Sequence, residues 1–326
     1  MKLLANINLK YPLIQGGMAV RVSTAPLAGA VASAGGIGVI AATGMSMEEL
    51  RREIKEARKI ASGGIIGVNV MYAVRDFAEL VKTALQEKVD LVISGAGFSR
   101  DIFSWGREAC IPIFTIVSSA RLAKIAEKYG ASAVVAEGTE AGGHLGTDRP
   151  TVEILPEIKG AVKIPVIAAG GITDGGDIEK MLQLGADGIQ MATRFVLSRE
   201  CSVAESFKAH YLSASREDLV LIKSPVGLPG RAIRNVFSEA LSRGEAPKPL
   251  CENCLKTCSH EFCILKALEN SRLGNIDRGV VFSGQNVYKI KEILPVKTII
   301  DHLSRAFSDQ VTSNININSS TIPGTG

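Results

Sequence analysis

The sequence predicts an α/β protein in which eight short strands alternate with helices and a cysteine-containing helical segment is inserted after the eighth strand. Two observations support this prediction. Short apolar runs, most of them rich in Val and Ile, suit strands that are buried on both faces of a parallel sheet. Between these runs lie longer stretches in which apolar residues recur at helical spacing among Glu, Lys and Arg.

The eight apolar runs begin about 20 to 33 residues apart, which is the spacing of successive strand–helix units. They are Pro12–Gln15, Ile37–Ala41, Ile65–Asn69, Leu91–Ser94, Ile113–Val117, Ala133–Ala136, Val166–Ala169 and Gly188–Met191. Eight units favour a closed (β/α)₈ TIM barrel. The alternative is an open doubly wound sheet, which more often has fewer strands and a G-x-G-x-x-G fingerprint after the first, and no such fingerprint is present here.

Helical patterning is clearest in four stretches between the runs, namely Ser46–Ile60, Asp76–Gln86, Ala120–Tyr129 and Ile178–Leu184. After the eighth run the repeat breaks. We therefore predict three parts: a barrel made of residues 1–198 and 276–310, a helical insertion at 199–275, and a disordered tail at 311–326 that is rich in Ser, Thr and Asn.

Composition narrows the function. The 326 residues are 46% apolar and carry a formal net charge of +4. Because the basic residues are scattered, nucleic acid is not an expected partner, whereas an anionic small molecule is compatible with this charge. No run approaches the roughly 18 apolar residues of a membrane span, and the N-terminus lacks the apolar centre of a signal peptide. We expect a cytoplasmic protein with no membrane partner.

In a barrel of this type, ligands bind at the C-terminal ends of the strands. The first strand ends in Gln15-Gly16-Gly17-Met18, where two glycines let the backbone approach a flat ligand and Met18 offers a main-chain N–H and an apolar surface. A plain turn is the alternative. Asn69 ends the third strand, where its amide suits the polar edge of a ring or caps the next helix. The small residues Ser94–Gly97 after the fourth strand could lie beneath a ring.

The most informative loop follows the sixth strand and reads Glu137-Gly-Thr-Glu-Ala-Gly-Gly-His144. Small residues before a histidine favour an imidazole placed over a site, where it can exchange a proton near neutral pH, although a structural role is the alternative. Ala168–Ile172 and Gln190–Arg194 follow strands seven and eight, the usual phosphate site of such barrels. Arg194 is expected to pair with a phosphate or with an acidic neighbour.

Several of these segments, in this order, resemble the signature segments of the nitronate monooxygenase (2-nitropropane dioxygenase) family, which includes the flavin-dependent enoyl-acyl-carrier-protein reductases. They are Gln15–Met18, Glu137–His144, Ala168–Ile172 and Gln190–Phe195. The resemblance covers about residues 10 to 235, with a final match at Gly279–Gln285. It implies that the barrel binds one flavin mononucleotide (FMN).

The resemblance also implies roles for individual residues. His144 matches the catalytic histidine of the family, which faces the flavin in the monooxygenases and lies beside the enoyl thioester in the reductases. The residues that would hold FMN are Gly16, Gly17, Met18, Asn69, Glu137, Gly142, Gly143, Ala169, Gly170, Gly171, Gln190, Met191, Ala192 and Thr193.

The insertion contains four cysteines in the pattern C-x₂-C-x₃-C-x₄-C, at Cys251, Cys254, Cys258 and Cys263. Four thiolates can surround one metal centre, and both a [4Fe–4S] cluster and zinc fit such ligands. The spacing matches neither a ferredoxin nor paired zinc knuckles, and free thiols are the alternative. An iron–sulfur cluster would supply electrons to FMN in place of a nicotinamide.

Three functions follow. The first is an FMN-dependent nitronate monooxygenase with His144 near the flavin. The second is an NAD(P)H-dependent flavin enoyl-acyl-carrier-protein reductase, to whose branch the loops at 94–97 and 137–144 look closer. The third is a non-catalytic flavin-binding redox sensor, which has no need of a titratable histidine at this loop. The substrate would be a small nitronate or an enoyl thioester. The sequence leaves open NAD(P)H as the electron donor, and the oligomeric state, a homodimer included.

Overall fold

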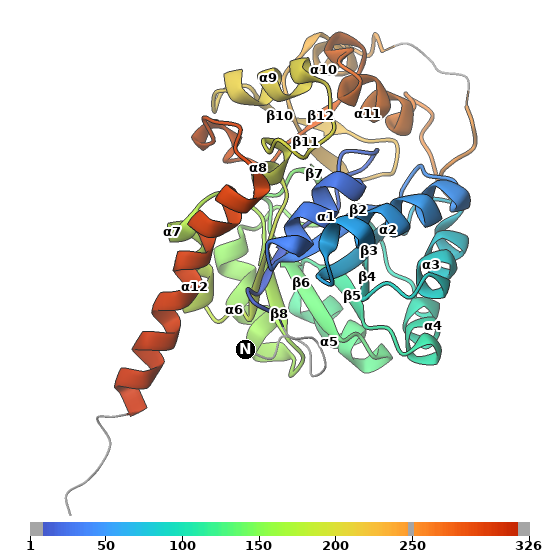
Figure 1. The fold of residues 1–326 in the computed structure, drawn as a ribbon. Helices are drawn as coiled ribbons and strands as arrows, with labels where there is room; N and C mark the ends of the chain where they lie inside the picture. The colour runs from blue at the N-terminus through green and yellow to red at the C-terminus, as the bar shows by residue number, and fades with distance from the viewer. Residues whose placement is uncertain (1–8, 247–250, 319–326) are drawn as a thin grey trace, which may run out of the picture.

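The structure, a computed structural model, describes residues 9–246 and 251–318, with side chains described as far as residue 307. Its centre is a closed barrel of eight parallel strands, so the predicted fold class is confirmed (Figure 1). The barrel strands are β1 (Leu13–Gln15), β2 (Ile37–Ala41), β3 (Ile65–Met71), β4 (Leu91–Gly95), β5 (Ile113–Val117), β6 (Ala133–Glu137), β8 (Val166–Ala169) and β9 (Gly188–Met191). The barrel closes where β1 pairs with both β2 and β9.

Helices follow the strands and surround the barrel. They are α1 (Ala25–Ser33), α2 (Met47–Ala61), α3 (Phe77–Gln86), α4 (Asp101–Ala109), α5 (Ala120–Tyr129), α6 (Thr151–Ala161) and α7 (Gly175–Gln183). A short helix, α8 (Thr193–Val196), follows β9, and α12 (Val296–Asn318) packs against α7 and α1 to complete the ring. In Figure 1 this last helix is the long red one beside the barrel.

The disordered tail was predicted to begin at residue 311, but helix α12 continues to Asn318. Residues 308–318 contain neither Gly nor Pro, so no backbone feature stops the helix at residue 311. The remainder of the predicted tail, 319–326, lies outside the described residues.

The interior of the barrel is filled by apolar side chains that alternate along the strands, among them Ile14, Val39, Ile93 and Phe114. A second apolar layer lies between the strands and the helices. The first strand joins the second by few backbone contacts, and the buried amide of Gln15 strengthens this seam by bonding to both the N–H and the C=O of Val39. The sheet therefore presents a rigid rim of strand ends.

The predicted helical insertion contains helices, but it also contains a β-hairpin that the sequence analysis did not predict. Its elements are α9 (Glu205–Ser213), β10 (Leu219–Lys223), β11 (Pro229–Ile233), α10 (Val236–Ser242) and α11 (Ile264–Arg272). The hairpin forms because Val- and Ile-containing segments flank a turn with Pro225 and Gly227, the latter at φ +82°.

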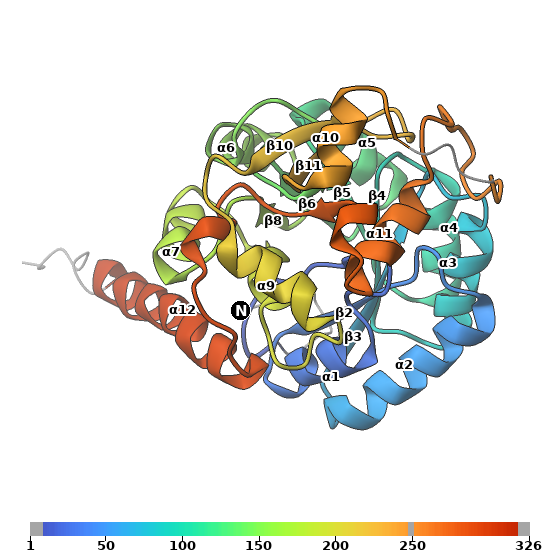
Figure 2. The same cartoon turned by 90° about the horizontal axis from the view of Figure 1, so that it is seen from above.

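The hairpin belongs to a small antiparallel sheet over the barrel. Strand β11 pairs with β10, with β7 (Gly143–His144) from the loop after β6, and with β12 (Val281–Phe282). Two 3₁₀ turns, η1 (Ile276–Arg278) and η2 (Val287–Lys289), flank β12. Figures 1 and 2 show α9, α10 and α11 gathered over one end of the barrel. Within the described ranges, no helix is both long and apolar enough to cross a membrane.

Candidate active site

Two adjoining cavities lie at the C-terminal ends of the barrel strands. The larger, of about 210 Å³, is bordered by the loops after β1, β3, β4, β6 and β9, and the smaller, of about 60 Å³, by the loops after β8 and β9. The two share the lining residues Glu137, Gly142, Gln190, Ala192 and Thr193. Every residue predicted to hold FMN lines one or both cavities, and His144 lines the larger.

The loop after β1 approaches β3 very closely. A Cβ atom added to Gly17 would lie 2.4 Å from the Cβ of Asn69, so only glycine leaves this backbone in place. Asn69 lies within β3, and α3 begins only at Phe77, so Asn69 does not cap that helix. The main-chain N–H of Met18 donates to the Ser23 hydroxyl at 2.8 Å, so Met18 contributes its apolar side chain and not the expected donor.

A polar group in this lining needs a partner. The side-chain oxygen of Gln190 is buried and has no hydrogen-bond partner in the described part of the chain. Buried amide oxygens are nearly always satisfied, so this atom calls for a donor from a ligand. FMN has such donors in its ring N–H and ribityl hydroxyls. Together with the close-fitting glycines, this oxygen makes the lining suitable for FMN.

The smaller cavity has the features expected of the phosphate end. Gly170 and Gly171 adopt φ values of +103° and +72°, and the Asn286 amide donates to the Gly171 carbonyl at 2.6 Å. The Thr193 hydroxyl accepts from the N–H of Gly284 and still has its own proton to donate. Arg194 does not reach the phosphate end, because its buried guanidinium donates to the backbone carbonyls of Leu197, just after α8, and of Glu292, before α12, and lines neither cavity. Of the two expected partners, the acidic neighbour is the one present, since Glu292 interacts electrostatically with the guanidinium.

His144 is held by the insertion as well as by its own loop. It lies on β7 and pairs with Gly230 of β11. Its Nε2 lies 2.7 Å from the hydroxyl oxygen of Ser224, and its ring packs against that of Phe282 in a T-shaped arrangement with a centroid distance of 5.1 Å. Burial lowers the pKa of His144 to about 4, so the imidazole is neutral at pH 7.

Glu137 ends β6 and borders both cavities. The residue is partly accessible from the cavities, but protein atoms surround its carboxyl group closely. This burial raises the pKa of Glu137 to about 7, so the carboxyl group is poised to be protonated near neutral pH. The cavity therefore combines a neutral histidine with a carboxyl group that is half protonated near pH 7.

One wall of the larger cavity was missed by sequence reasoning. It consists of apolar side chains from the insertion and from the segment at β12: Phe207 and Tyr211 of α9, Ile264, Leu265 and Leu268 of α11, Val280 just before β12, and Phe282 of β12. Apolar residues at helical spacing were visible in both helices, but periodicity does not reveal which surface a helix covers. The wall makes the larger cavity suitable for a substrate with an apolar part.

The four cysteines line a third cavity, of about 70 Å³, together with Arg75 and His260. Backbone N–H groups two residues further on donate to the sulfurs of Cys251 and Cys258, at 3.3 and 3.4 Å. Even so, the described residues include no group of three or more His, Cys, Asp or Glu side chains placed to hold a metal ion. The iron–sulfur or zinc centre thus gains no support from the structure and stays a prediction.

Comparisons with known proteins agree with this geometry. The family model for nitronate monooxygenase matches the chain over residues 1–87 and 64–305. A probable nitronate monooxygenase from Staphylococcus aureus (strain JH9) is 30% identical over 345 aligned positions, covering 91% of this chain and 94% of that protein. A 5-hydroxy-7a-methyl-1-oxo-octahydro-1H-indene-4-carboxyl-CoA dehydrogenase from Mycobacterium tuberculosis is 32% identical over 241 residues, covering 73% of this chain and 67% of that protein.

Solved structures show the same architecture. FabK from Thermotoga maritima superposes with a TM-score of 0.84 at 34% identity, over 95% of this chain and 96% of that one. A nitroalkane oxidase from Streptomyces ansochromogenes superposes with a TM-score of 0.79 at 26% identity, over 94% of this chain and 98% of that one. In both cases the similarity extends over the insertion as well as the barrel.

Proposed function

This chain belongs to the nitronate monooxygenase family of flavin-dependent oxidoreductases, and from that premise we propose that it binds FMN and oxidises nitronates beside His144. The observation that carries the proposal is that a half-buried, neutral imidazole lines the same cavity as the predicted flavin-binding residues. FMN, when bound, supplies the redox chemistry, with oxygen as the final electron acceptor.

The chain's own residues would do the rest. Gly17 and Asn69 would hold the ring, and the Gly170–Gly171 turn and Thr193 would hold the phosphate. The neutral His144 can take the α-proton of the conjugate nitroalkane, which leaves the nitronate that is oxidised, or it can donate a hydrogen bond to the nitronate oxygens. The apolar wall from α9 and α11 would exclude water and accept the alkyl part of the nitronate.

The test is an absorption spectrum of protein purified without oxygen, followed by addition of a nitronate. We expect flavin absorption near about 450 nm that bleaches with the nitronate and returns with oxygen. NADH and an enoyl thioester are added to separate samples. Bleaching by NADH with turnover of the thioester, but none with the nitronate, would favour the reductase. A spectrum without flavin would overturn the proposal.

His144→Ala tests the catalytic residue. This variant should keep its FMN but lose turnover by about 10²- to 10⁴-fold, the usual contribution of a positioned acid or base. His302→Ala is the matched control, because His302 is an exposed histidine on α12 outside both cavities. Full activity of the His144 variant would show that the imidazole has no catalytic role.

A metal centre at the cysteines remains a separate proposal. Its support is the spacing of the four thiols, their shared cavity and the two N–H···S bonds. The described residues include no group of three or more thiols placed to hold a metal ion, so no step of the reaction is assigned to a metal. Elemental analysis of protein purified without oxygen tests whether a metal is bound. We expect metal in the wild type and none in Cys254→Ser, and equal content in both would contradict the proposal.

A further inference from the structure

His144 and Ser224 come from segments 80 residues apart, yet the His144 Nε2 and the Ser224 hydroxyl oxygen are only 2.7 Å apart. Both are fixed by the same hairpin. Ser224 begins the turn between β10 and β11, where its N–H donates to the Leu228 carbonyl and its C=O accepts from Gly227. His144 is paired with Gly230 of β11 in the same sheet. The contact is therefore held from both sides by backbone hydrogen bonds.

The Ser224 hydroxyl does not reach the substrate. A serine bonded to a histidine is also the arrangement of an activated nucleophile. Ser224, however, is only 5% exposed and is not among the residues that line the larger cavity. Whatever Ser224 does in catalysis, it does through His144.

The other ring nitrogen of His144, Nδ1, differs from Nε2 because it has no hydrogen-bond partner in the described part of the chain. It is also not buried, since the buried side-chain atoms without a partner do not include it. Since His144 lines the cavity while its Nε2 is occupied by Ser224, Nδ1 is the nitrogen accessible to a substrate. A neutral imidazole has one proton, so the partner of Nε2 decides whether Nδ1 is an acceptor or a donor.

We propose that Ser224 is a positioning residue: its hydroxyl oxygen accepts a hydrogen bond from Nε2–H of His144 and so keeps the lone pair of Nδ1 directed at the substrate. When Nδ1 takes the α-proton of a neutral nitroalkane, the electrons of the C–H bond stay on the substrate as a nitronate. The positive charge on the ring is then shared with Nε2–H, and the bond to Ser224 strengthens. The insertion thus orients the proton acceptor that the barrel loop carries. This inference rests on the proposed function of His144.

The tautomer can be measured directly. Ring ¹⁵N shifts of protein labelled at its four histidines distinguish the two neutral forms, and subtraction of the His144→Ala spectrum assigns the His144 signals. We expect the Nε2–H form in the wild type, with and without FMN, and a mixture of both forms in Ser224→Ala. Ser224→Thr, which keeps the hydroxyl, should restore the single form.

Kinetics supply the second readout. Ser224→Ala should lower kcat about tenfold, as expected for loss of one hydrogen bond to the ring, with KM changed less than about twofold. Ser198→Ala is the matched control, because Ser198 is an equally buried serine whose hydroxyl donates to a backbone carbonyl at 2.7 Å. It should leave both the tautomer and kcat unchanged.

The outcomes separate the two claims. A single tautomer and a normal kcat in Ser224→Ala, together with an inactive His144→Ala, would overturn the role of Ser224 and leave the proposed function intact. Full activity in His144→Ala would instead overturn the catalytic role of the histidine. An Nδ1–H form in the wild type would also refute the proposed direction of the hydrogen bond.

Discussion

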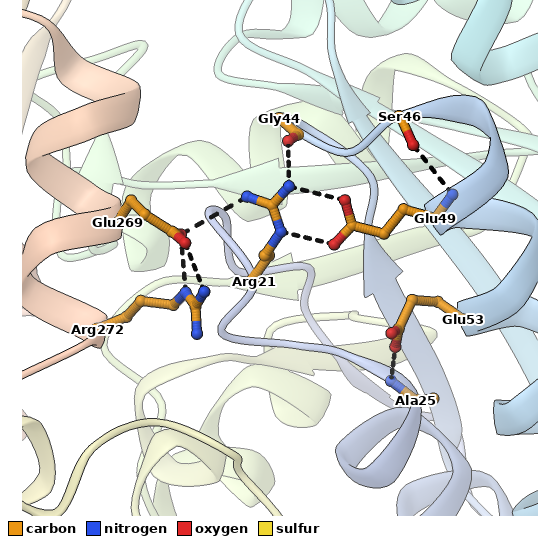
Figure 3. A network of polar contacts seen from close by, with 8 residues as sticks. All are labelled: Arg21, Ala25, Gly44, Ser46, Glu49, Glu53, Glu269 and Arg272. Carbon is orange, nitrogen blue, oxygen red and sulfur yellow. Dashed lines mark hydrogen bonds and ion pairs between the residues drawn. The ribbon is translucent and has the colours of Figure 1, made fainter.

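Arg21, on the loop between β1 and α1, forms an ion pair with Glu269 of α11, with 3.6 Å between Nη1 and Oε2 (Figure 3). The same guanidinium makes two hydrogen bonds, of 2.6 and 2.7 Å, to the carboxylate of Glu49 on α2 and a third to the Gly44 carbonyl. Arg21 therefore joins the barrel to the helix whose residues Ile264, Leu265 and Leu268 form the apolar wall.

Glu269→Gln removes the charge that links α11 to Arg21, and with it the ion pair of Glu269 with Arg272 inside α11, while leaving Arg21 bonded to Glu49. A half-exposed ion pair contributes about 0.5–1 kcal/mol, so we expect amide hydrogen exchange in α11 to quicken roughly two- to fivefold. KM for the substrate should rise, because the wall that binds its apolar part becomes less ordered. Hydrogen exchange followed by mass spectrometry measures the first effect and steady-state kinetics the second.

A matched control is Glu87→Gln, which breaks the Arg51–Glu87 ion pair of 2.7 Å between α2 and the end of α3. That pair is also partly exposed, and neither of its residues lines the cavities. Equal exchange in α11 in both variants would show that Arg21 does not hold the wall.

Gly17→Ala tests the flavin cradle. Because its Cβ would lie 2.4 Å from the Cβ of Asn69, the loop or β3 must shift, and overpacking of this kind costs about 1–3 kcal/mol. We expect FMN affinity to fall at least about tenfold, measured by fluorescence titration of the FMN-free protein. Gly160→Ala is the control, since no atom lies within 4 Å of the added Cβ there. Unchanged affinity in Gly17→Ala would remove this loop from the proposed site.

Lys256 holds the loop that contains the four cysteines, residues 251–263, against the barrel. Its ammonium lies 3.5 Å from the ring centroid of Tyr72 and 4.8 Å from that of Phe77, and its N–H donates to the Ala73 carbonyl. Lys256→Ala should lose about 1 kcal/mol of docking energy and raise the alkylation rate of the half-buried Cys254 roughly fivefold. Lys59→Ala, on the exposed face of α2, serves as control. The same Cys254 reactivity in both would mean that the aromatic contact does not hold the loop.

The barrel could be predicted because its strands are local features. Runs such as Ile113–Val117 are apolar over their whole length, and the structure places a strand there with the predicted bounds. The rim loops followed from the same reasoning, since the glycines at 16–17 and 170–171 stand at strand ends. Where a bound shifted, as for β3 ending at Met71, a neighbouring strand continued the pairing: Met71 aligns with Gly95.

The apolar wall and the contact between His144 and Ser224 could not be predicted, because they depend on contacts between segments that are distant in the sequence. Ser224 and His144 meet only after the β10–β11 hairpin pairs with β7, and nothing in the spacing of 80 residues indicates this. The insertion was predicted to be helical, but without the bounds of α9 and α11, and the position of these helices over the cavity is set by the small sheet and by Arg21. A resemblance to a family supplied the role of His144, which periodicity alone does not.

Glu137 and His144 should give the FMN-free protein two opposite pH dependences of stability. The pKa of Glu137 is raised to about 7, so its contribution is complete below about pH 4.5 and is lost as the pH rises through 7. The pKa of His144 is lowered to about 4, so its contribution is complete above about pH 6.5 and is lost as the pH falls toward 4. Between pH 5 and 7 the two effects offset each other.

Single variants should show each pH dependence of the free energy of unfolding separately. In Glu137→Gln the free energy of unfolding should rise by about 2 kcal/mol from pH 5 to 7, and in His144→Ala it should fall by a similar amount. Urea titrations of the FMN-free proteins measure both. The pKa of His210 is also lowered by burial, which adds the same upward slope to every variant, so the difference between the two pH curves is the quantity to compare. Parallel pH curves for the two variants would mean that neither group is buried as described.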